Sequence, residues 1–172
     1  QMDGTYFPIM LNEFGSLVTF RDLREEEIEV GKARVETMLL NHPGACLGYK
    51  VKHDGKTLCY VTDNELYPPK SKFFNEEYRA KLIGFIKDSD VLITDTTYME
   101  EDYHEHWGHS TITQVTNLAH KANIKKLFLF HHDPLHSDDF IDTKHERACS
   151  ILKELGSETE CVAPKERQTF EL

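Results

Sequence analysis

Residues 46–63 read CLGYKVKHDGKTLCYVTD, and this stretch contains the clearest hairpin signal in the chain. Two β-rich runs, residues 46–52 and 57–61, flank the turn-forming sequence HDGK, and Asp-Gly is a strong signal for a tight turn between antiparallel strands. Asp63 comes two residues after the end of the second run. The stretch therefore predicts a hairpin whose outgoing strand brings a carboxylate to the edge of a sheet.

Outside this hairpin, the apolar pattern predicts further strands, and after Asp63 strands alternate with helices. The expected strands are residues 17–20, 28–30, 35–40, 91–94, 126–130, 161–163 and 169–172. One helix is expected from a cap at Asn75 to residue 87, and a second from a cap at Ser110 along an apolar stripe ending at Ala122. A third runs from about residue 143 to 155 and stops at Gly156. This order predicts an α/β sandwich layer rather than a doubly wound sheet.

The composition bounds the class of protein. The 172 residues are 39% hydrophobic and 29% charged, with no linker or repeat, so one domain over residues 1–172 is expected. The net charge of −10 disfavours nucleic acid as a partner without excluding a local basic patch. No run is long enough for a membrane span and no secretory signal is visible. Four cysteines without a C-x-x-C pair indicate a reducing, cytoplasmic compartment.

Four polar residues follow apolar strands directly or within two residues. They are His42, Asp63, Asp95 and His131. Strand ends bring distant parts of a chain together at one edge of a sheet, where α/β folds commonly bind ligands. Two imidazoles and two carboxylates also form a ligand set that suits Zn²⁺, iron or Mn²⁺. The pattern predicts a metal site, although any one of these aspartates alone would be read as a turn residue.

Five pieces of the chain occur in an order and at a spacing that resemble a known family. They are Gly48-Tyr49, Tyr60-Val61-Thr62-Asp63, Leu92-Ile93-Thr94-Asp95, Gly108-His109-Ser110-Thr111 and Leu127-Phe128-Leu129-Phe130-His131. Together they resemble the second half of the metallo-β-lactamase superfamily, in particular its ribonuclease Z and phosphodiesterase-like branch, over roughly residues 36–163. The resemblance implies half of an αββα sandwich, with a mixed sheet and helices on one face.

The resemblance also implies a role for each site residue. His42 is similar to the histidine that binds the first metal, Asp63 to the carboxylate that bridges two metals, and His131 to the last histidine on the second metal. Asp95 and His109 are similar to the acid–histidine pair that orients and protonates the leaving oxygen, although the branch usually has Glu at the position of Asp95. Two zinc ions are implied in an intact site, with iron or manganese as alternatives.

The implied activity is metal-dependent hydrolysis of a phosphodiester or another small-molecule substrate. The family's H-x-H-x-D-H motif should precede His42, but no histidine lies between Gln1 and Asn41. Gln1 is not a natural translation start, so the chain is expected to be processed or cut from a longer protein. Without that motif, the 172 residues alone should bind metal weakly and have little or no activity.

Two alternatives remain open. The chain could be a complete, non-catalytic half-fold that serves as a binding or dimerising module, because half of a sandwich exposes a sheet face. A second copy would then cover that face, whereas in a longer protein the missing N-terminal half would cover it. A redox or sensing role with iron is the other alternative, which metal analysis would separate from zinc hydrolysis.

Other histidines near the predicted site have two readings each. The run His104-Glu105-His106-Trp107-Gly108-His109 has metal-ligand spacing, or it is a solvated loop in which only His109 faces the site. His132, Asp133 and His136 would support or replace His131, or they are loop residues. Trp107 would line a substrate pocket or shield the loop.

Overall fold

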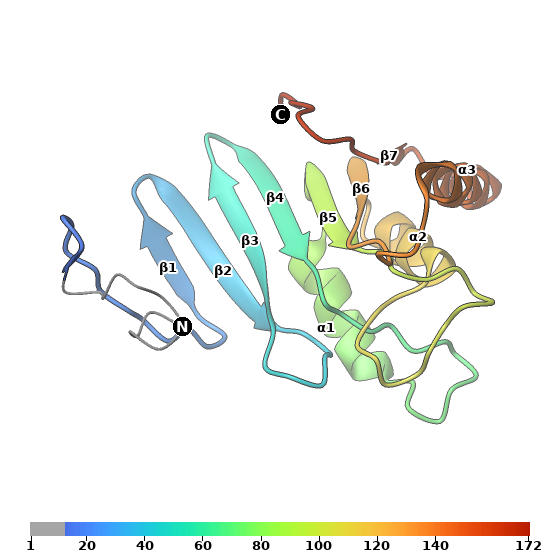
Figure 1. Ribbon diagram of the computed structural model, residues 1–172, viewed down its shortest axis with the longest axis horizontal. Helices are drawn as coiled ribbons and strands as arrows, with labels where there is room; N and C mark the ends of the chain where they lie inside the picture. The colour runs from blue at the N-terminus through green and yellow to red at the C-terminus, as the bar shows by residue number, and fades with distance from the viewer. Residues whose placement is uncertain (1–12) are drawn as a thin grey trace.

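The computed structural model describes residues 13–172, and within them one sheet carries seven strands in chain order (Figure 1). The strands are β1 (Glu27–Val30), β2 (Ala33–Leu39), β3 (Leu47–His53), β4 (Lys56–Val61), β5 (Val91–Asp95), β6 (Lys126–Phe130) and β7 (Glu160–Val162). β1 to β4 pair antiparallel, and β4 to β7 pair parallel. The carboxyl ends of β4, β5 and β6 therefore meet at one edge of the sheet.

Three helices connect the parallel strands and cover one face of the sheet: α1 (Glu76–Ile86), α2 (Ile112–Lys121) and α3 (Asp138–Glu154). Alternation along a strand sends every second side chain to this face, and Cys59, Leu92 and Leu127 meet there in register. They form one buried cluster with residues of all three helices, which include Leu82, Val115, Leu118 and Ile151. The predicted fold class, a mixed sheet with helices on one face, is confirmed.

Two expected strands are wrong. Residues 17–20 and 169–172 pair with no strand in the described part of the chain. Leu17 and Phe20 are exposed, so their β-rich composition has no neighbouring strand to support it. Phe170 instead packs its ring against Phe128, with 4.8 Å between the ring centroids. The C-terminal segment thus contributes an apolar side chain without extending the sheet.

The helix starts also differ from prediction in two cases. α3 begins five residues earlier than expected, because the Ser137 side chain accepts a hydrogen bond from the backbone of Phe140 and caps the helix. Thr111, not Ser110, caps α2. The Ser110 hydroxyl is buried and donates to the backbone oxygen of Asn64 at 2.5 Å. The predicted cap at Asn75 is confirmed by its hydrogen bond from Tyr78 N.

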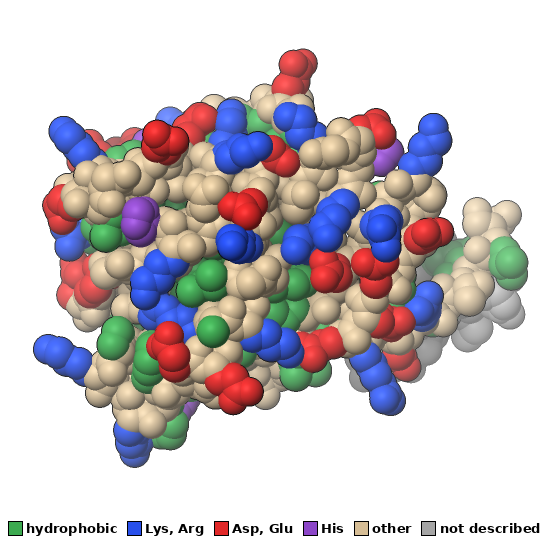
Figure 2. All heavy atoms as spheres, turned by 180° about the vertical axis from the view of Figure 1, so that it is seen from behind, with side chains coloured by type: hydrophobic (Ala, Val, Ile, Leu, Met, Phe, Trp, Pro, Cys, Tyr) green, Lys and Arg blue, Asp and Glu red, His purple; other side chains and the backbone are tan. Residues whose placement is uncertain are grey.

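The two faces of the sheet differ in how they are covered. Figure 2 shows the molecule from behind, with basic and acidic side chains interspersed over the surface. On the face opposite the helices, Tyr60 and Phe130 are 37% and 41% exposed, with their rings 6.1 Å apart.

No helix within residues 13–172 has the length and apolar character required to cross a membrane.

Candidate functional site

The parallel half of the sheet brings three predicted residues to one edge. Asp63 follows β4, Asp95 ends β5 and His131 follows β6. Because β5 lies between β4 and β6, the backbone of Asp63 lies on one side of Asp95 and the backbone of His131 on the other. Asp63, Asp95, His131 and His109, from the segment before α2, each offer one ligand atom, and these four atoms lie within 4.8 Å of one another.

Asp63 and His131 share an uncommon backbone conformation. Their φ angles are 56° and 55°, in the left-handed region that costs free energy for residues other than glycine. Strained residues of this kind concentrate at functional sites. His131 Nε2 lies 3.1 Å from Asp63 Oδ1, and both side chains are more than one third exposed. The left-handed turns after β4 and β6 thus place these two side chains face to face and within reach of solvent.

Asp95 is buried and occupied on both carboxylate oxygens. Its Oδ1 accepts from the backbone N–H groups of Thr97 (3.0 Å) and Ser110 (3.3 Å). Its Oδ2 accepts from Asn64 N at 3.3 Å and lies 2.6 Å from His109 Nδ1. This hydrogen bond from His109 raises the pKa of His109, while partial burial of the imidazole opposes the rise. The arrangement orients the imidazole, and it leaves His109 Nε2 for a substrate or a ligand.

His42 lies beside this group rather than inside it. Its ring centroid is 5.8 Å from that of His109, and its Nδ1 accepts a hydrogen bond from Gly44 N at 3.2 Å. A neutral His42 therefore carries its proton on Nε2 in this geometry, and binding a metal through Nε2 requires the other tautomer. Gly108 allows the close packing, because a Cβ there would lie 2.2 Å from Cδ2 of His42.

Buried Glu65 organises the loop that contains His104, His106 and Trp107. Its carboxylate accepts hydrogen bonds from the Tyr103 hydroxyl at 2.5 Å, His106 N at 2.8 Å and Gly108 N at 3.0 Å. His106 packs edge-on against Phe73, and His104 stacks on Trp107. Of this run, only His109 belongs to the four-residue group found among residues 13–172.

Lys144 of α3 reaches the loop after His131 from behind. It is fully buried, and its Nζ donates to Thr97 O at 2.9 Å and lies 3.3 Å from His132 Nδ1 and 3.4 Å from His136 Nδ1. Burial, with the nearby Lys144 and His136 charges, lowers the pKa of His132 to about 4. His132 and His136 thus face Lys144, whereas His131 faces Asp63.

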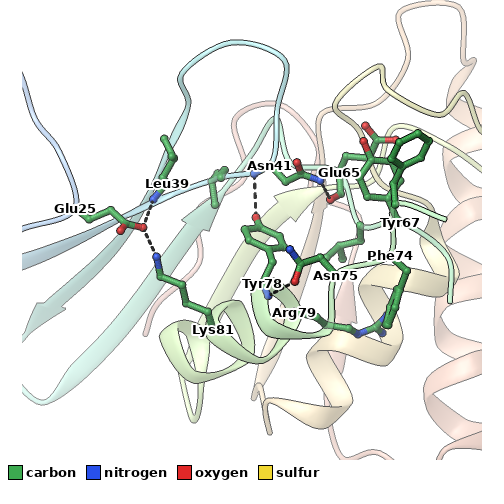
Figure 3. A pocket seen from close by; sticks show the side chains of 13 residues that line it. Glu25, Leu39, Asn41, Glu65, Tyr67, Phe74, Asn75, Tyr78, Arg79 and Lys81 are labelled. Atoms are coloured by element: carbon green, nitrogen blue, oxygen red, sulfur yellow. Dashed lines mark hydrogen bonds and ion pairs between the residues drawn. The ribbon is translucent and has the colours of Figure 1, made fainter. Parts of the chain in front are cut away.

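Two cavities flank the His42 loop. The first, about 290 Å³, is lined by Asn41, His42, Pro43, Glu65, Tyr67 and His106. The second, about 350 Å³, is shown in Figure 3 and lies between the end of β2 and α1. In the second cavity, the Tyr78 hydroxyl accepts from Asn41 N at 3.0 Å. Tyr78 therefore holds the backbone that leads into His42, and none of the four grouped residues lines this cavity.

The donor set fits a divalent metal ion. Carboxylate oxygens and imidazole nitrogens suit zinc, iron and manganese, and two such ligands on one zinc ion lie roughly 3 to 3.5 Å apart. The 3.1 Å between His131 Nε2 and Asp63 Oδ1 falls in this range. Asp95, with its oxygens occupied by hydrogen bonds, suits the support of His109 better than direct ligation.

Comparisons with known proteins identify the family. A model of the beta-lactamase superfamily domain matches residues 9–132. A ribonuclease Z of Sulfurisphaera tokodaii is 40% identical over 60 residues, which are 35% of this chain and 20% of that protein. A ribonuclease Z of Thermoplasma volcanium is 38% identical over 151 residues, which cover 66% of this chain and 50% of that protein. The chain thus spans half or less of these relatives' length.

Solved structures share the fold at low sequence identity. The metallo-beta-lactamase fold protein YhfI from Bacillus subtilis superimposes with a TM-score of 0.58 at 15% identity, covering 81% of this chain and 50% of that one. A diphosphatase from the PhnP family gives a TM-score of 0.54 at 19% identity, covering 87% and 48%. At these identities the likeness concerns the fold, and again about half of each neighbour is matched.

Proposed function

Because this chain belongs to the beta-lactamase superfamily, we propose that it forms part of a metal-dependent hydrolase that acts on phosphodiesters. One observation carries the proposal: the ligand atoms of Asp63, Asp95, His109 and His131 lie within 4.8 Å of one another. The names of the similar proteins, ribonuclease Z and diphosphatase, support a phosphorus-centred substrate. The activity proposed is that of the whole protein, of which these residues supply one side of the site.

Each site residue has a proposed role. Asp63 and His131 would hold metal directly, since they are more than one third exposed and face each other. His42 would be a further ligand, after its ring takes the tautomer that frees Nε2. Zinc is the proposed ion, with iron or manganese as alternatives. A bound ion would lower the pKa of a water molecule and polarise a phosphoryl oxygen.

His109 would donate the proton that the leaving oxygen needs. Its Nδ1 is held by Asp95 at 2.6 Å, so the proton on Nε2 points away from the buried carboxylate. The raised pKa of His109, caused by this hydrogen bond, keeps the imidazolium populated nearer to neutral pH, which suits a general acid. Asp95 would act as a positioning residue through His109.

Metal binding by the 172-residue chain tests the ligand assignment. Mn²⁺ is the suitable probe, because carboxylate and imidazole ligands suit it better than thiolates do. We expect weak Mn²⁺ binding, measured by electron paramagnetic resonance of the free ion, that is lost in Asp63→Asn and in His131→Ala. The matched control is His53→Ala, since His53 lies in the exposed β3–β4 hairpin. Equal binding in all four proteins would overturn the assignment.

Hydrolysis of a dinucleoside phosphate, whose alkoxide leaving group needs a proton, tests the reaction class. The activity of the metal-loaded chain should be low, because it has few ligands, and it should fall at least about tenfold in His109→Gln, which removes a general acid. A substrate cleaved equally by wild type and His109→Gln would contradict the role of His109. Absence of hydrolysis in a chain that binds Mn²⁺ would favour the non-catalytic alternative.

That alternative has its own supporting observation. Tyr60 and Phe130 form a partly exposed aromatic pair on the face opposite the helices. We propose that this face is covered in the functional protein, either by a further segment of the same protein or by a second copy. A second copy would make the chain a dimerising module, whether or not it is catalytic. Light scattering of the 172-residue chain separates a dimer from a monomer.

A further inference from the structure

A second group of metal-ligating side chains lies beside the edge strand of the sheet, on α3 and β7. His145 and Cys149 are four residues apart on α3, which places them on the same face of the helix. Cys161 lies at the centre of β7, and in-register pairing with Leu127 turns it toward the helix-covered face. The ligand atoms of the three residues lie within 4.8 Å of one another.

The separation between His145 and Cys149 suits a tetrahedral zinc site. His145 Nε2 lies 3.5 Å from Cys149 Sγ. A nitrogen at about 2.1 Å and a sulfur at about 2.3 Å from one zinc ion are separated by roughly 3.5 Å. The backbone oxygen of Cys161 lies 3.0 Å from the same nitrogen, so the imidazole points at β7. Cys161 Sγ lies within 4.8 Å of both other ligand atoms, so rotation of the side chains can bring all three to one ion.

We propose that His145, Cys149 and Cys161 bind a Zn²⁺ ion that ties α3 to the edge strand β7, independently of the proposed hydrolase site. Two thiolates and one imidazole supply three ligands, and a water molecule completes the tetrahedron. Binding releases the two thiol protons to solvent, while the imidazole proton moves from Nε2 to Nδ1, so the site carries no net charge. β7 is only three residues long, so few backbone hydrogen bonds hold it to β6. The ion would add a further link between β7 and α3.

The state of the cysteines without metal agrees with this role. Cys161 packs against the apolar cluster under the sheet, an environment that disfavours a free thiolate. Cys149 is exposed and Cys161 half-buried, which leaves an entry path for the ion from the Cys149 side. A soft cation would stabilise the thiolate that burial disfavours.

Cobalt substitution is the test, because a thiolate bound to Co²⁺ gives a sulfur-to-metal charge-transfer band in the near ultraviolet. With the 172-residue chain kept reduced by a phosphine, we expect this band to saturate at one Co²⁺ per chain and to vanish when Zn²⁺ is added. The band should be lost in Cys149→Ser, in Cys161→Ser and in His145→Gln. Zn²⁺ should also raise the thermal midpoint of wild type but not of Cys149→Ser, whose exposed side chain can change without disturbing the core.

Two controls separate this site from the proposed hydrolase site. Cys46→Ser should keep the band, because Cys46 lies near the proposed hydrolase site, with its thiol donating to Thr62 O at 3.3 Å. His131→Ala should keep it as well, because His131 belongs to the other group. A reduced chain without the band, or a band that survives in Cys149→Ser, would overturn the proposal. A Cys149–Cys161 disulfide formed in air, with no cobalt band in the reduced chain, would also overturn it.

Discussion

Gly108 packs closely against His42 and has a backbone conformation that favours glycine. Its φ is +85°, and a Cβ there would lie 2.2 Å from Cδ2 of His42 and 2.7 Å from Cδ of Pro43. We expect Gly108→Ala to displace the His42 ring and to lower the free energy of unfolding by about 1–3 kcal/mol. Urea denaturation measures the loss, and Mn²⁺ affinity should fall with it.

Gly84 provides the matched control for this substitution. It lies inside α1, and nothing lies within 4 Å of the Cβ that a substitution would add. Gly84→Ala should therefore raise the free energy of unfolding by about 0.5–1 kcal/mol through helix propensity. If the two alanine variants had the same effect, close packing at Gly108 would not explain its presence.

The hydrogen bond between His109 and Asp95 can be tested by titration of the metal-free chain. The pKa of His109 is raised mainly by this bond and lowered by partial burial. Asp95→Asn removes the carboxylate charge and keeps the burial, so the pKa of His109 should fall. Nuclear magnetic resonance of the imidazole C–H protons measures the change. An unchanged pKa of His109 in Asp95→Asn would contradict the conclusion that the hydrogen bond to Asp95 raises it.

At the residue scale, the sequence revealed the strand-end residues and missed those that support them. Asp63, Asp95 and His131 follow apolar runs, so a simple pattern locates them. Glu65, Thr97 and Lys144 are buried beside these residues, but no pattern marks them. Lys144 contacts Thr97 across 47 positions of sequence, and only the folded chain brings the two together. The metal roles of His42, Asp63 and His131 stay predictions.

At the element scale, α3 carries a buried amine whose protonation affects stability. Burial lowers the pKa of Lys144 to about 8, below its ordinary value near 10.5. Between these values the unfolded chain binds more protons, so the free energy of unfolding rises with pH. Below about pH 8 Lys144 is charged in the folded chain, and its burial lowers the free energy of unfolding by the full amount.

Lys144→Met should remove this pH dependence. From about pH 7 to about pH 10, wild type should gain up to about 3 kcal/mol relative to the variant, since each pKa unit corresponds to about 1.4 kcal/mol. Urea denaturation of both proteins at the two pH values measures the difference, in which the other titrating groups cancel. A difference that does not change with pH would mean that Lys144 keeps its ordinary pKa in the folded chain.

Prediction of the elements succeeded where residues have pairing partners or clear caps. The hairpin at residues 46–61 and the central strands follow from alternation and from the Asp-Gly turn. Residues 17–20 are also rich in β-forming residues, but no strand in the described part of the chain pairs with them. Composition alone cannot show whether a partner strand is present. The early start of α3 was missed because the cap at Ser137 precedes two acidic residues instead of the apolar stripe. The resemblance to the metallo-β-lactamase superfamily is confirmed by the domain model.

For the whole molecule, the partly exposed pair Tyr60 and Phe130 predicts association. Phe130→Asp places a charge on the face opposite the helices, and it should lower the fraction of dimer or the affinity for a complementing segment. Leu17→Asp is the control, since Leu17 is 96% exposed and lies in the segment before β1. Light scattering over a concentration series measures the change. Equal masses for both variants would indicate that this face stays open to solvent.

The order of the sheet has a consequence for how the protein forms. Each strand from β2 to β7 pairs with the one that precedes it in the chain, so the partner of each has already been made. A nascent chain leaving the ribosome can therefore add one strand at a time to a growing sheet. Once β6 and the turn after it have emerged, the strands that carry Asp63, Asp95 and His131 are all available to pair, before α3 and β7 are synthesised.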